Sequence, residues 1–356
     1  MHTIRPGFQP IRKQKVACEA RATFLFFMFS RAGCIAVNHG YLYNNIYSKE
    51  QREGVLTMRW LTFQRPGLED HKAMVHWGVT DGETVWALDG ASGFSTLLYM
   101  IEKGETAQRA SRMLAERAMA GELSVPSFAL ADVTIRAPYI PRNHITCVGK
   151  NYADHARELA PGGVMPDLSV PIFFTKAPHT VIGPEETIDP HPGITDALDY
   201  EGEIAVIIGK SGRNISRHEA MSYVFGYALL NDVTARDLQK AHQQYFKGKS
   251  LDTFAPWGPW ITPADDIDDV QALTFQTLVN GEVRQTGYVR DMIFSIPELI
   301  ESLSRGMTLP AGTIIATGTP SGVGAGMNPP KYLHPGDTIV IESEQLGVLK
   351  NTVGGA

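Results

Sequence analysis

The sequence predicts an α+β fold in which β-strands dominate. Asp81-Gly82 and Asn280-Gly281 each stand between two short strand-like segments, and such dipeptides are typical of tight β-hairpin turns. Residues 204–208 form a β-branched, apolar run with the composition of a buried strand. Helical patterns stand between the strand-like segments, the longest of them over residues 95–120. We therefore expect a mixed architecture with a β-sheet framework.

Length and composition limit the class of protein. The 356 residues are enough for one large domain or two moderate ones. A formal net charge of -6 gives no basic surface for nucleic acid, and no apolar run is long enough for a membrane span. Cys18, Cys34 and Cys147 are too few for a disulfide framework or a zinc site. This fits a reducing compartment, and we expect the cytoplasm.

Residues 1–57 differ from the rest of the chain. They contain eight Lys or Arg residues against three acidic residues, and they include a short apolar island at residues 24–29. An Arg-rich, acid-poor start is typical of a mitochondrial presequence, which would place the protein in the matrix. In the other hypothesis the start is misassigned, and the working protein begins near Met58, just before a strand-like segment. We treat residues 1–57 as an atypical N-terminal extension.

Residues 58–138 are predicted to form a small, β-rich supporting domain. Strand-like segments at residues 74–79 and 84–88 flank the Asp81-Gly82 turn, and the helical stretch of residues 95–120 follows them. No constellation of polar residues marks this part as a site. Residues 140–143 look like the link to the main domain, which we place at residues 139–356.

A strand, a glycine turn and a short helix are predicted over residues 145–159. On this helix His155 and Glu158 are three positions apart and share one face. A carboxylate beside an imidazole orients the ring and raises its basicity, as a general base for water requires. The other interpretation is an exposed ion pair on a helix. Pro161-Gly162-Gly163 ends the helix, so the segment has the character of a lid.

Glu201 and Glu203 stand at the mouth of the predicted strand 204–208. Side chains two apart on a strand share a face, so both carboxylates point the same way and repel each other unless a cation or proton separates them. Mg²⁺ or Mn²⁺ fits such oxygen ligands, and Asp232, just past another apolar strand, is the candidate for a third. A solvated pair of glutamates is the alternative. A structural Ca²⁺ site is disfavoured because no EF-hand spacing appears.

Two further segments offer polar groups that suit a small anionic ligand. Asp232, Arg236 and Gln239 are spaced as on one helix face, which would present a metal ligand, a guanidinium and an amide together. Lys249, in a short Lys-Gly-Lys segment, could stabilise an oxyanion or simply be a solvated loop lysine. Ser216 with Glu219 predicts another helix start.

The C-terminal third is predicted to combine one helix, a glycine-rich loop and several strands. Residues 294–304 predict a helix that begins at Ser295 with Pro297 in its first turn. A strand at residues 313–316 leads into a loop that contains Gly318 and Thr319 and that can clamp a carboxylate or form a simple tight turn. Residues 338–341 and 348–353 are the last predicted strands.

Taken in order, these segments resemble the fumarylacetoacetate hydrolase family. The resemblance runs over residues 145–353 and rests on Gly149-Lys150-Asn151-Tyr152 with His155 and Glu158, Asp199-Tyr200-Glu201-Gly202-Glu203, Asn231-Asp232 with Arg236 and Gln239, Gly248-Lys249-Ser250, and residues 317–322. It implies a mixed β-sandwich roll, a homodimer, and Mg²⁺ or Mn²⁺ held by Glu201, Glu203 and Asp232. It also implies catalytic roles for His155, Glu158 and Lys249, and substrate contacts from Lys150, Arg236, Gln239, Gly318 and Thr319.

The resemblance implies metal-dependent cleavage of a carbon–carbon bond in a small 2-oxo acid, with the metal as electron sink for a pyruvate enolate. Water activated by His155 would make the protein an acylpyruvate hydrolase, whereas loss of CO₂ from C3 of oxaloacetate, which gives the same enolate, would make it an oxaloacetate decarboxylase. Proton transfer on that enolate gives the third outcome, an isomerase of the 5-carboxymethyl-2-hydroxymuconate type from aromatic catabolism. A non-enzymatic, metal-stabilised binding module is the fourth interpretation.

Overall fold

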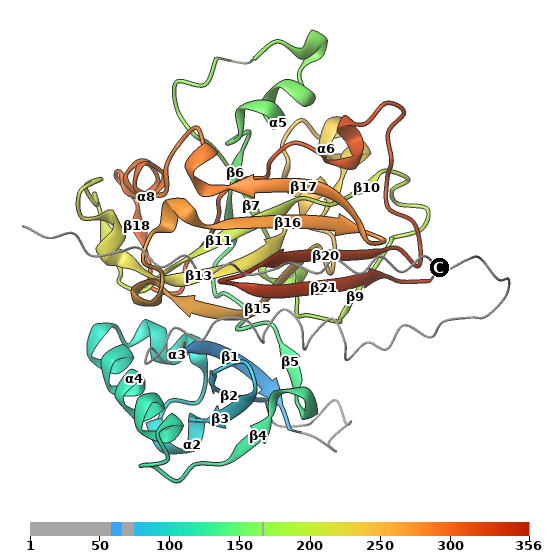
Figure 1. Cartoon of the computed structure of the whole chain (residues 1–356). Coiled ribbons are helices and arrows are strands. Elements are labelled where there is room, and N and C mark those ends of the chain that lie inside the picture. The colour runs from blue at the N-terminus through green and yellow to red at the C-terminus, as the bar shows by residue number, and fades with distance from the viewer. Residues whose placement is uncertain (1–57, 66–74, 166, 356) are drawn as a thin grey trace, which may run out of the picture. The chain divides into compact units, whose positions relative to one another are not determined.

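The computed structural model describes residues 58–65, 75–165 and 167–355 (Figure 1). The hypotheses about a presequence and a misassigned start concern residues 1–57 and lie outside the described residues. Among the described helices, none has the length and apolar character needed to cross a membrane. The predicted α+β, strand-rich class is confirmed.

The first described part of the chain forms strands around a hairpin. β2 (Val75–Thr80) and β3 (Thr84–Ala87) pair through Gly78↔Ala87, as predicted from the turn between them. In that turn Oδ1 of Asp81 accepts the backbone N–H groups of Glu83 and Thr84, at 2.9 and 2.8 Å. The other strands here are β1 (Arg59–Gln64), β4 (Ser127–Ala129) and β5 (Thr134–Arg136).

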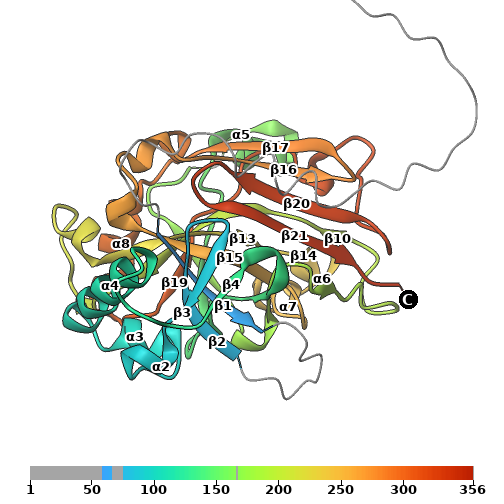
Figure 2. The same cartoon turned by 60° about the horizontal axis from the view of Figure 1, so that its bottom comes forward.

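The predicted helical stretch of residues 95–120 is two helices. α3 (Leu97–Glu102) begins after Thr96, whose side chain accepts the N–H of Tyr99, and α4 (Glu105–Met119) follows. Gly104 separates them with φ 79°, a conformation that only glycine adopts without strain. Apolar residues of α3 share a core with Trp60 and Trp77 of the neighbouring strands, and Figures 1 and 2 show α3 and α4 beside β1 to β3. A short helix, α2 (Asp89–Ser92), precedes them.

One large sheet connects the first strands to the rest of the fold. Its order is β4-β3-β2-β1-β15-β13-β11-β19-β6-β7, and β1 pairs with β15 through Trp60↔Ile261. Hydrogen-bonded strands thus continue across residue 138, where we placed a domain boundary, and the domain division stays a prediction. The strands of this sheet that follow β5 in the sequence are β6 (Ile145–Gly149), β7 (Ile172–Lys176), β11 (Gly202–Ile208), β13 (Val224–Asn231), β15 (Ala255–Pro263) and β19 (Ile314–Ala316).

A second sheet packs against the large one. It has the order β17-β16-β20-β21-β9, with β9 (Thr187–Ile188), β16 (Thr274–Val279), β17 (Glu282–Tyr288), β20 (Thr338–Ser343) and β21 (Gly347–Val353). The predicted hairpin between β16 and β17 is confirmed, with φ 52° at Asn280 and φ 80° at Gly281, as a type I′ turn requires.

Strand β11 is buried on both of its faces. Ile204, Val206 and Ile208 share a core with residues of the second sheet, whereas Ala205 and Ile207 belong to the core that includes the first strands. A strand covered on both sides reads as a continuous apolar run and does not alternate. This explains why the run of residues 204–208 predicted a buried strand.

The remaining elements are short. The helices are α5 (Ala153–Glu158), α6 (Arg236–Ala241), α7 (Phe246–Lys249) and α8 (Ile296–Ser304), and the small strands are β8 (Val181–Ile182), β10 (Leu198–Asp199), β12 (Gly212–Arg213), β14 (Thr234–Ala235) and β18 (Thr308–Leu309). The helix predicted from Ser216 is wrong. The Ser216 hydroxyl does donate to the Glu219 carboxylate, but only a 3₁₀ turn, Ala220–Tyr223, fits before β13 begins at Val224.

Helix α8 gives a direct test of a predicted helix start. The carboxylate of Glu298 accepts both the N–H and the hydroxyl of Ser295, at 2.8 and 2.7 Å. Replacing this N-cap serine should lower the free energy of unfolding by about 1 kcal/mol, because the first turn loses its side-chain cap. We expect Ser295→Ala to lower the midpoint of urea unfolding accordingly. Ser222→Ala, at an exposed turn, is the control; equal midpoints for both variants would contradict the capping role.

Candidate active site

Eight of the eleven predicted site residues line one cavity of about 350 Å³. Its wall is built from the end of β6, helices α5, α6 and α7, strand β11 and the loop after β19. The residues that line it are Val148, Gly149, Lys150, His155, Leu159, Phe174, Glu201, Glu203, Arg236, Gln239, Lys240, Gln243, Tyr245, Lys249 and Thr319. Segments far apart in the chain thus form one polar pocket.

Glu201, Glu203 and Asp232 form a buried acidic trio beside this cavity. The pairing of β11 with β13 sets Gly202 opposite Asn231, which brings the two glutamates close to the aspartate that follows β13. Each residue offers one carboxylate oxygen, and these oxygens lie within 4.8 Å of one another. The glutamates are buried and not solvated, so the alternative of an exposed pair does not hold.

Three cations surround two members of the acidic trio. Nζ of Lys249 lies 2.7 Å from Oε2 of Glu201 and 2.8 Å from Oδ2 of Asp232. Nη1 of Arg236 lies 2.7 Å from Oε1 of Glu201, and Nζ of Lys176 lies 2.6 Å from Oδ1 of Asp232. Burial raises the pKa of Glu201, but the charges of Lys249 and Arg236 outweigh it and hold that pKa at about 2. Glu201 is therefore ionised at any physiological pH.

Glu203 has a different environment. Its Oε2 accepts the N–H of Gly318 at 2.8 Å. Burial raises its pKa well above the ordinary value, and the negative charges of Asp232 and Glu201 raise it further. In the absence of an added cation, this carboxyl therefore holds its proton to a higher pH than an exposed glutamate does.

The acidic trio fits a hard divalent cation. Three carboxylates converge, and oxygen donors are the ligands that Mg²⁺ and Mn²⁺ prefer. The ammonium group of Lys249 already bridges two of these carboxylates, so the pocket stabilises positive charge at this point. Burial and the negative charges of Asp232 and Glu201 raise the pKa of Glu203. A cation at this point would offset the repulsion between the carboxylates.

His155 and Glu158 form a pair on helix α5, as their spacing predicts. Nδ1 of His155 lies 3.2 Å from Oε2 of Glu158, and the other oxygen of Glu158 accepts the N–H of Gly322 at 2.9 Å. Only 4% of the His155 surface is exposed, so this is not the exposed ion pair considered from the sequence. The pair is held in the wall of the cavity by a loop more than a hundred residues away in the chain.

The predicted substrate-contacting residues reach the site in different ways. Lys150, Arg236, Gln239 and Thr319 line the cavity, and Lys150 does so with a positive φ of 58°. Gly318 is not in the lining, because its N–H is bonded to Glu203. Of the two lysines in the Lys-Gly-Lys segment, Lys247 is exposed and Lys249 is buried between carboxylates.

The prediction that Asp232, Arg236 and Gln239 share one helix face is wrong. Asp232 follows β13, and β14 (Thr234–Ala235) comes between it and α6, which begins at Arg236. Pairing of β14 with β10 (Leu198–Asp199) keeps these residues extended. Arg236 and Gln239 do lie together, with 3.2 Å between Nη1 and Oε1.

Two buried residues of this site, Lys176 and Asp199, were not predicted from the sequence. Lys176 ends strand β7 and donates to Asp232, and a lysine that closes the apolar segment Ile-Phe-Phe-Thr was a usable signal. Asp199 is fully buried and accepts Nε of Arg236 at 2.8 Å. Asp199 belongs to one of the segments that carry the family resemblance, but its local pattern gave it no partner and no role.

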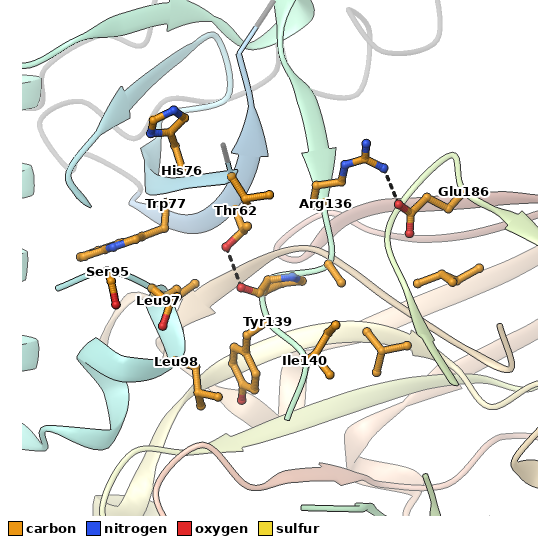
Figure 3. Close-up of a pocket in the computed structure, with 16 residues that line it drawn as sticks. Thr62, His76, Trp77, Ser95, Leu97, Leu98, Arg136, Tyr139, Ile140 and Glu186 are labelled. Atoms are coloured by element: carbon orange, nitrogen blue, oxygen red, sulfur yellow. Dashed lines mark hydrogen bonds and ion pairs between the residues drawn. The ribbon is translucent and has the colours of Figure 1, made fainter. Parts of the chain in front are cut away.

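A second cavity, of about 450 Å³, lies apart from these residues (Figure 3). Trp77, Leu97, Leu98 and Tyr139 give it mainly apolar walls, and at its rim Arg136 pairs with Glu186. None of the predicted site residues, all of which are described, lines it. We therefore place the candidate active site at the smaller, polar cavity.

Comparison with known proteins gives the same family as the site residues. Residues 144–354 match the family described as fumarylacetoacetate (FAA) hydrolase C-terminal. The chain is 50% identical over 262 residues to the oxaloacetate tautomerase YisK of Bacillus subtilis, covering 73% of this chain and 86% of that protein.

Solved structures agree. The fumarylacetoacetate hydrolase of the psychrophile Exiguobacterium antarcticum is 40% identical with a TM-score of 0.71, covering 84% of this chain and 100% of that chain. A 2-hydroxyhepta-2,4-diene-1,7-dioate isomerase of Mycobacterium marinum is 29% identical with a TM-score of 0.63, covering 84% and 98%. With more than half of the sequence matched and the buried acidic trio in place, this chain belongs to the fumarylacetoacetate hydrolase family.

Proposed function

We propose that this protein is a divalent-metal-dependent enzyme that interconverts the keto and enol forms of a small 2-oxo dicarboxylic acid such as oxaloacetate. The observation that carries the proposal is the meeting of the acidic trio, Lys249 and the His155–Glu158 pair at one cavity. The 50% identity to an oxaloacetate tautomerase supports the choice of reaction.

Glu201, Glu203 and Asp232 would hold the divalent cation. When bound, this cation supplies a Lewis acid for the oxygens of the 2-oxo acid. Burial alone would lower the pKa of Lys249, but the negative charges of Asp232 and Glu201 outweigh this effect and raise the pKa above its ordinary value. The ammonium group of Lys249 therefore stays charged at neutral pH. Lys249 therefore acts as a fixed positive charge beside the developing enolate oxygen and not as a base.

His155 is the base in this proposal. Its Nδ1 is directed to Glu158, so Nε2 is the atom that takes a proton from C3 of the substrate and returns one. Tautomerisation changes no σ bond other than those to hydrogen: the C2=O π bond is replaced by a C2=C3 π bond, and the proton removed from carbon balances the one placed on oxygen. Glu158 stabilises the imidazolium that forms in between.

Arg236 is suited to the second carboxylate of the substrate. Its Nη2 is buried and has no hydrogen-bond partner among the described residues, although its other nitrogens contact Asp199 and Glu201. An unpaired buried donor is costly, so a ligand carboxylate there would be bound strongly. Gln239 and Lys150 line the same cavity and complete an anion-binding wall.

Hydrolysis of an acylpyruvate is the second candidate, favoured by the 40% identity to a fumarylacetoacetate hydrolase. Here His155 would activate water for attack on the distal carbonyl, and the carbon–carbon bond to C3 would break, giving pyruvate and a carboxylic acid. Decarboxylation of oxaloacetate breaks the bond from C3 to its carboxylate, releases CO₂ to give the same pyruvate enolate, and needs no water. The three reactions share a site and differ in what leaves C3.

Parallel assays separate these reactions. Purified protein with Mg²⁺ or Mn²⁺, and with EDTA as control, is offered oxaloacetate, acetylpyruvate and fumarylpyruvate. Faster decay of the enol absorbance of oxaloacetate without pyruvate release is the expected result. Metal-dependent pyruvate from an acylpyruvate would assign hydrolysis, and from oxaloacetate alone, decarboxylation. No metal-dependent change in any of them would reject the proposal.

A homodimer and a cytoplasmic setting complete the proposal. They rest on the family resemblance and on the small number of cysteines. Light scattering of the purified protein tests the first, and a molar mass equal to one chain of 39.1 kDa would contradict it.

A further inference from the structure

Asp199 is a buried carboxylate that accepts four hydrogen bonds. Its Oδ2 accepts Nε of Arg236 at 2.8 Å and the N–H of Ala325 at 2.9 Å. Its Oδ1 accepts the N–H of Gly324 at 2.7 Å and that of Tyr200 at 3.0 Å. The side chain is fully buried, so its charge is balanced by these contacts alone and not by water. One carboxylate thus ties Arg236 to a loop that follows β19.

That loop, residues 322–326, also holds Glu158. The N–H of Gly322 donates to Oε1 of Glu158 at 2.9 Å. Gly326 packs so closely that a Cβ added to it would lie 2.2 Å from the Cδ atom of Glu158. The 322–326 loop therefore contacts the carboxyl group of Glu158 through Gly322 and Gly326, while the other oxygen of that group contacts His155.

Arg236 stands at the other end of this chain of contacts. Its guanidinium bonds to both Asp199 and Glu201, and its unpaired Nη2 belongs to a residue in the cavity wall. A carboxylate bound there would fix the guanidinium, and through it Asp199. The described contacts thus run without interruption from Arg236 through Asp199 and the loop to Glu158 and His155.

We propose that Asp199 is a positioning residue that couples the substrate-binding Arg236 to the orientation of the His155–Glu158 pair, by anchoring the 322–326 loop. The effect of this coupling on catalysis rests on the proposed function, in which His155 is the base and Arg236 binds the substrate. Its structural content, that Asp199 keeps Glu158 seated, stands independently of which 2-oxo acid is used. Asp199 itself lies outside the cavity lining, so it acts only through its neighbours.

Asp199→Asn tests the coupling with almost no change in size. One acceptor oxygen becomes an NH₂ group that faces N–H donors, so either the Gly324 and Tyr200 contacts or the Arg236 and Ala325 contacts fail. We expect kcat to fall roughly 10–100-fold, as for other partners that orient catalytic ligands. Where the new NH₂ group faces Arg236, KM should also rise, because the guanidinium loses its Nε contact. Amide hydrogen exchange should become faster in α5 and in residues 322–326.

Gly326→Ala reaches Glu158 from the opposite side. The atoms it would meet are the end of a flexible side chain, so the variant should fold and displace Glu158. We expect the same fall in kcat and the same faster exchange in α5, with KM unchanged because Arg236 keeps its contacts. Since both variants break one path, the double variant should lose little more activity than the worse single variant.

Asp237→Asn is the matched control. Asp237 is also on α6 and accepts the hydroxyl of Thr195 and its neighbour's N–H, but it is exposed and outside the cavity wall. In the Asp237→Asn variant, amide hydrogen exchange in α5 and the turnover number should equal those of the unchanged protein. Mn²⁺ affinity, measured by calorimetry, should stay within about threefold in all variants.

Two results would overturn the coupling. One is unchanged exchange in α5 for Asp199→Asn, and the other is a double variant whose loss of kcat is the product of the single losses. If Asp199→Asn loosens the whole protein, Gly326→Ala decides, and normal exchange in its α5 rejects the proposal. If the unchanged protein turns over no 2-oxo acid, the proposed function fails, while the exchange measurements still decide whether Asp199 seats Glu158.

Discussion

Glu203→Gln is expected to lower turnover by roughly 10³-fold or more while making the metal-free protein more stable. The amide has nearly the shape of the carboxyl, and its oxygen can still accept the N–H of Gly318, so the fold is retained. It is a poor ligand for a hard cation, however, and several kcal/mol of stabilisation of the developing enolate are lost with the cation. Steady-state turnover with saturating Mn²⁺ measures this loss.

The gain in stability follows from the pKa of Glu203. Burial, Asp232 and Glu201 raise this pKa in the folded chain above its unfolded value. The stability that Glu203 contributes is therefore fully present below the unfolded pKa and is lost as pH rises through the folded pKa. Glutamine does not ionise and escapes this loss. The unfolding temperature of the variant in EDTA should exceed that of the unchanged protein by a margin that widens from about pH 5 to pH 8.

Glu342→Gln is the control for this experiment. Glu342 lies on β20, and its pKa is also raised by burial, but it is not part of the acidic trio. Turnover should stay close to that of the unchanged protein. Normal turnover of Glu203→Gln with added Mg²⁺ or Mn²⁺ would reject the metal site, and a lower unfolding temperature in EDTA would reject the account of repulsion between the carboxylates.

Strand and hairpin positions were predictable because their causes are local. Asn280-Gly281 adopts the two positive φ values that its residues favour, and residues 204–208 are apolar because both faces of β11 are covered. The helix expected from Ser216 failed since the start of β13 leaves it too few residues. Here sheet pairing overrides a correct local capping signal.

The acidic trio was predictable in part for the same reason. Glu203 lies in β11 and Glu201 directly precedes this strand, and Asp232 follows β13, the strand that pairs with β11. Lys176 carried a local signal, a lysine at the end of an apolar segment, but its partner Asp232 is 56 residues away, and the partner of Asp199, Arg236, is 37 residues away. A buried charge is recognised by what pairs with it, and pairing across that separation is decided by the whole fold.

His155→Gln is expected to lower kcat by about 10²–10⁴-fold, the usual contribution of a positioned general base. Glutamine retains a polar side chain on α5 but cannot take a proton at the position of Nε2. Glu158→Gln should cost less, because it weakens the orientation of His155 and leaves the imidazole in place. Mn²⁺ affinity should be unchanged in both, since His155 is not one of the three carboxylate ligands.

His144→Gln gives the matched comparison, because His144 is exposed, stacks near Phe246 and is absent from the cavity wall. It should keep full activity. If His155→Gln loses tautomerisation and hydrolysis by the same factor, one base serves both reactions, taking a proton from C3 in the first and from water in the second. If His155→Gln keeps normal kcat on every substrate that the unchanged protein accepts, the base is another group, and Lys249 would then have to give up the charge that its carboxylate neighbours stabilise.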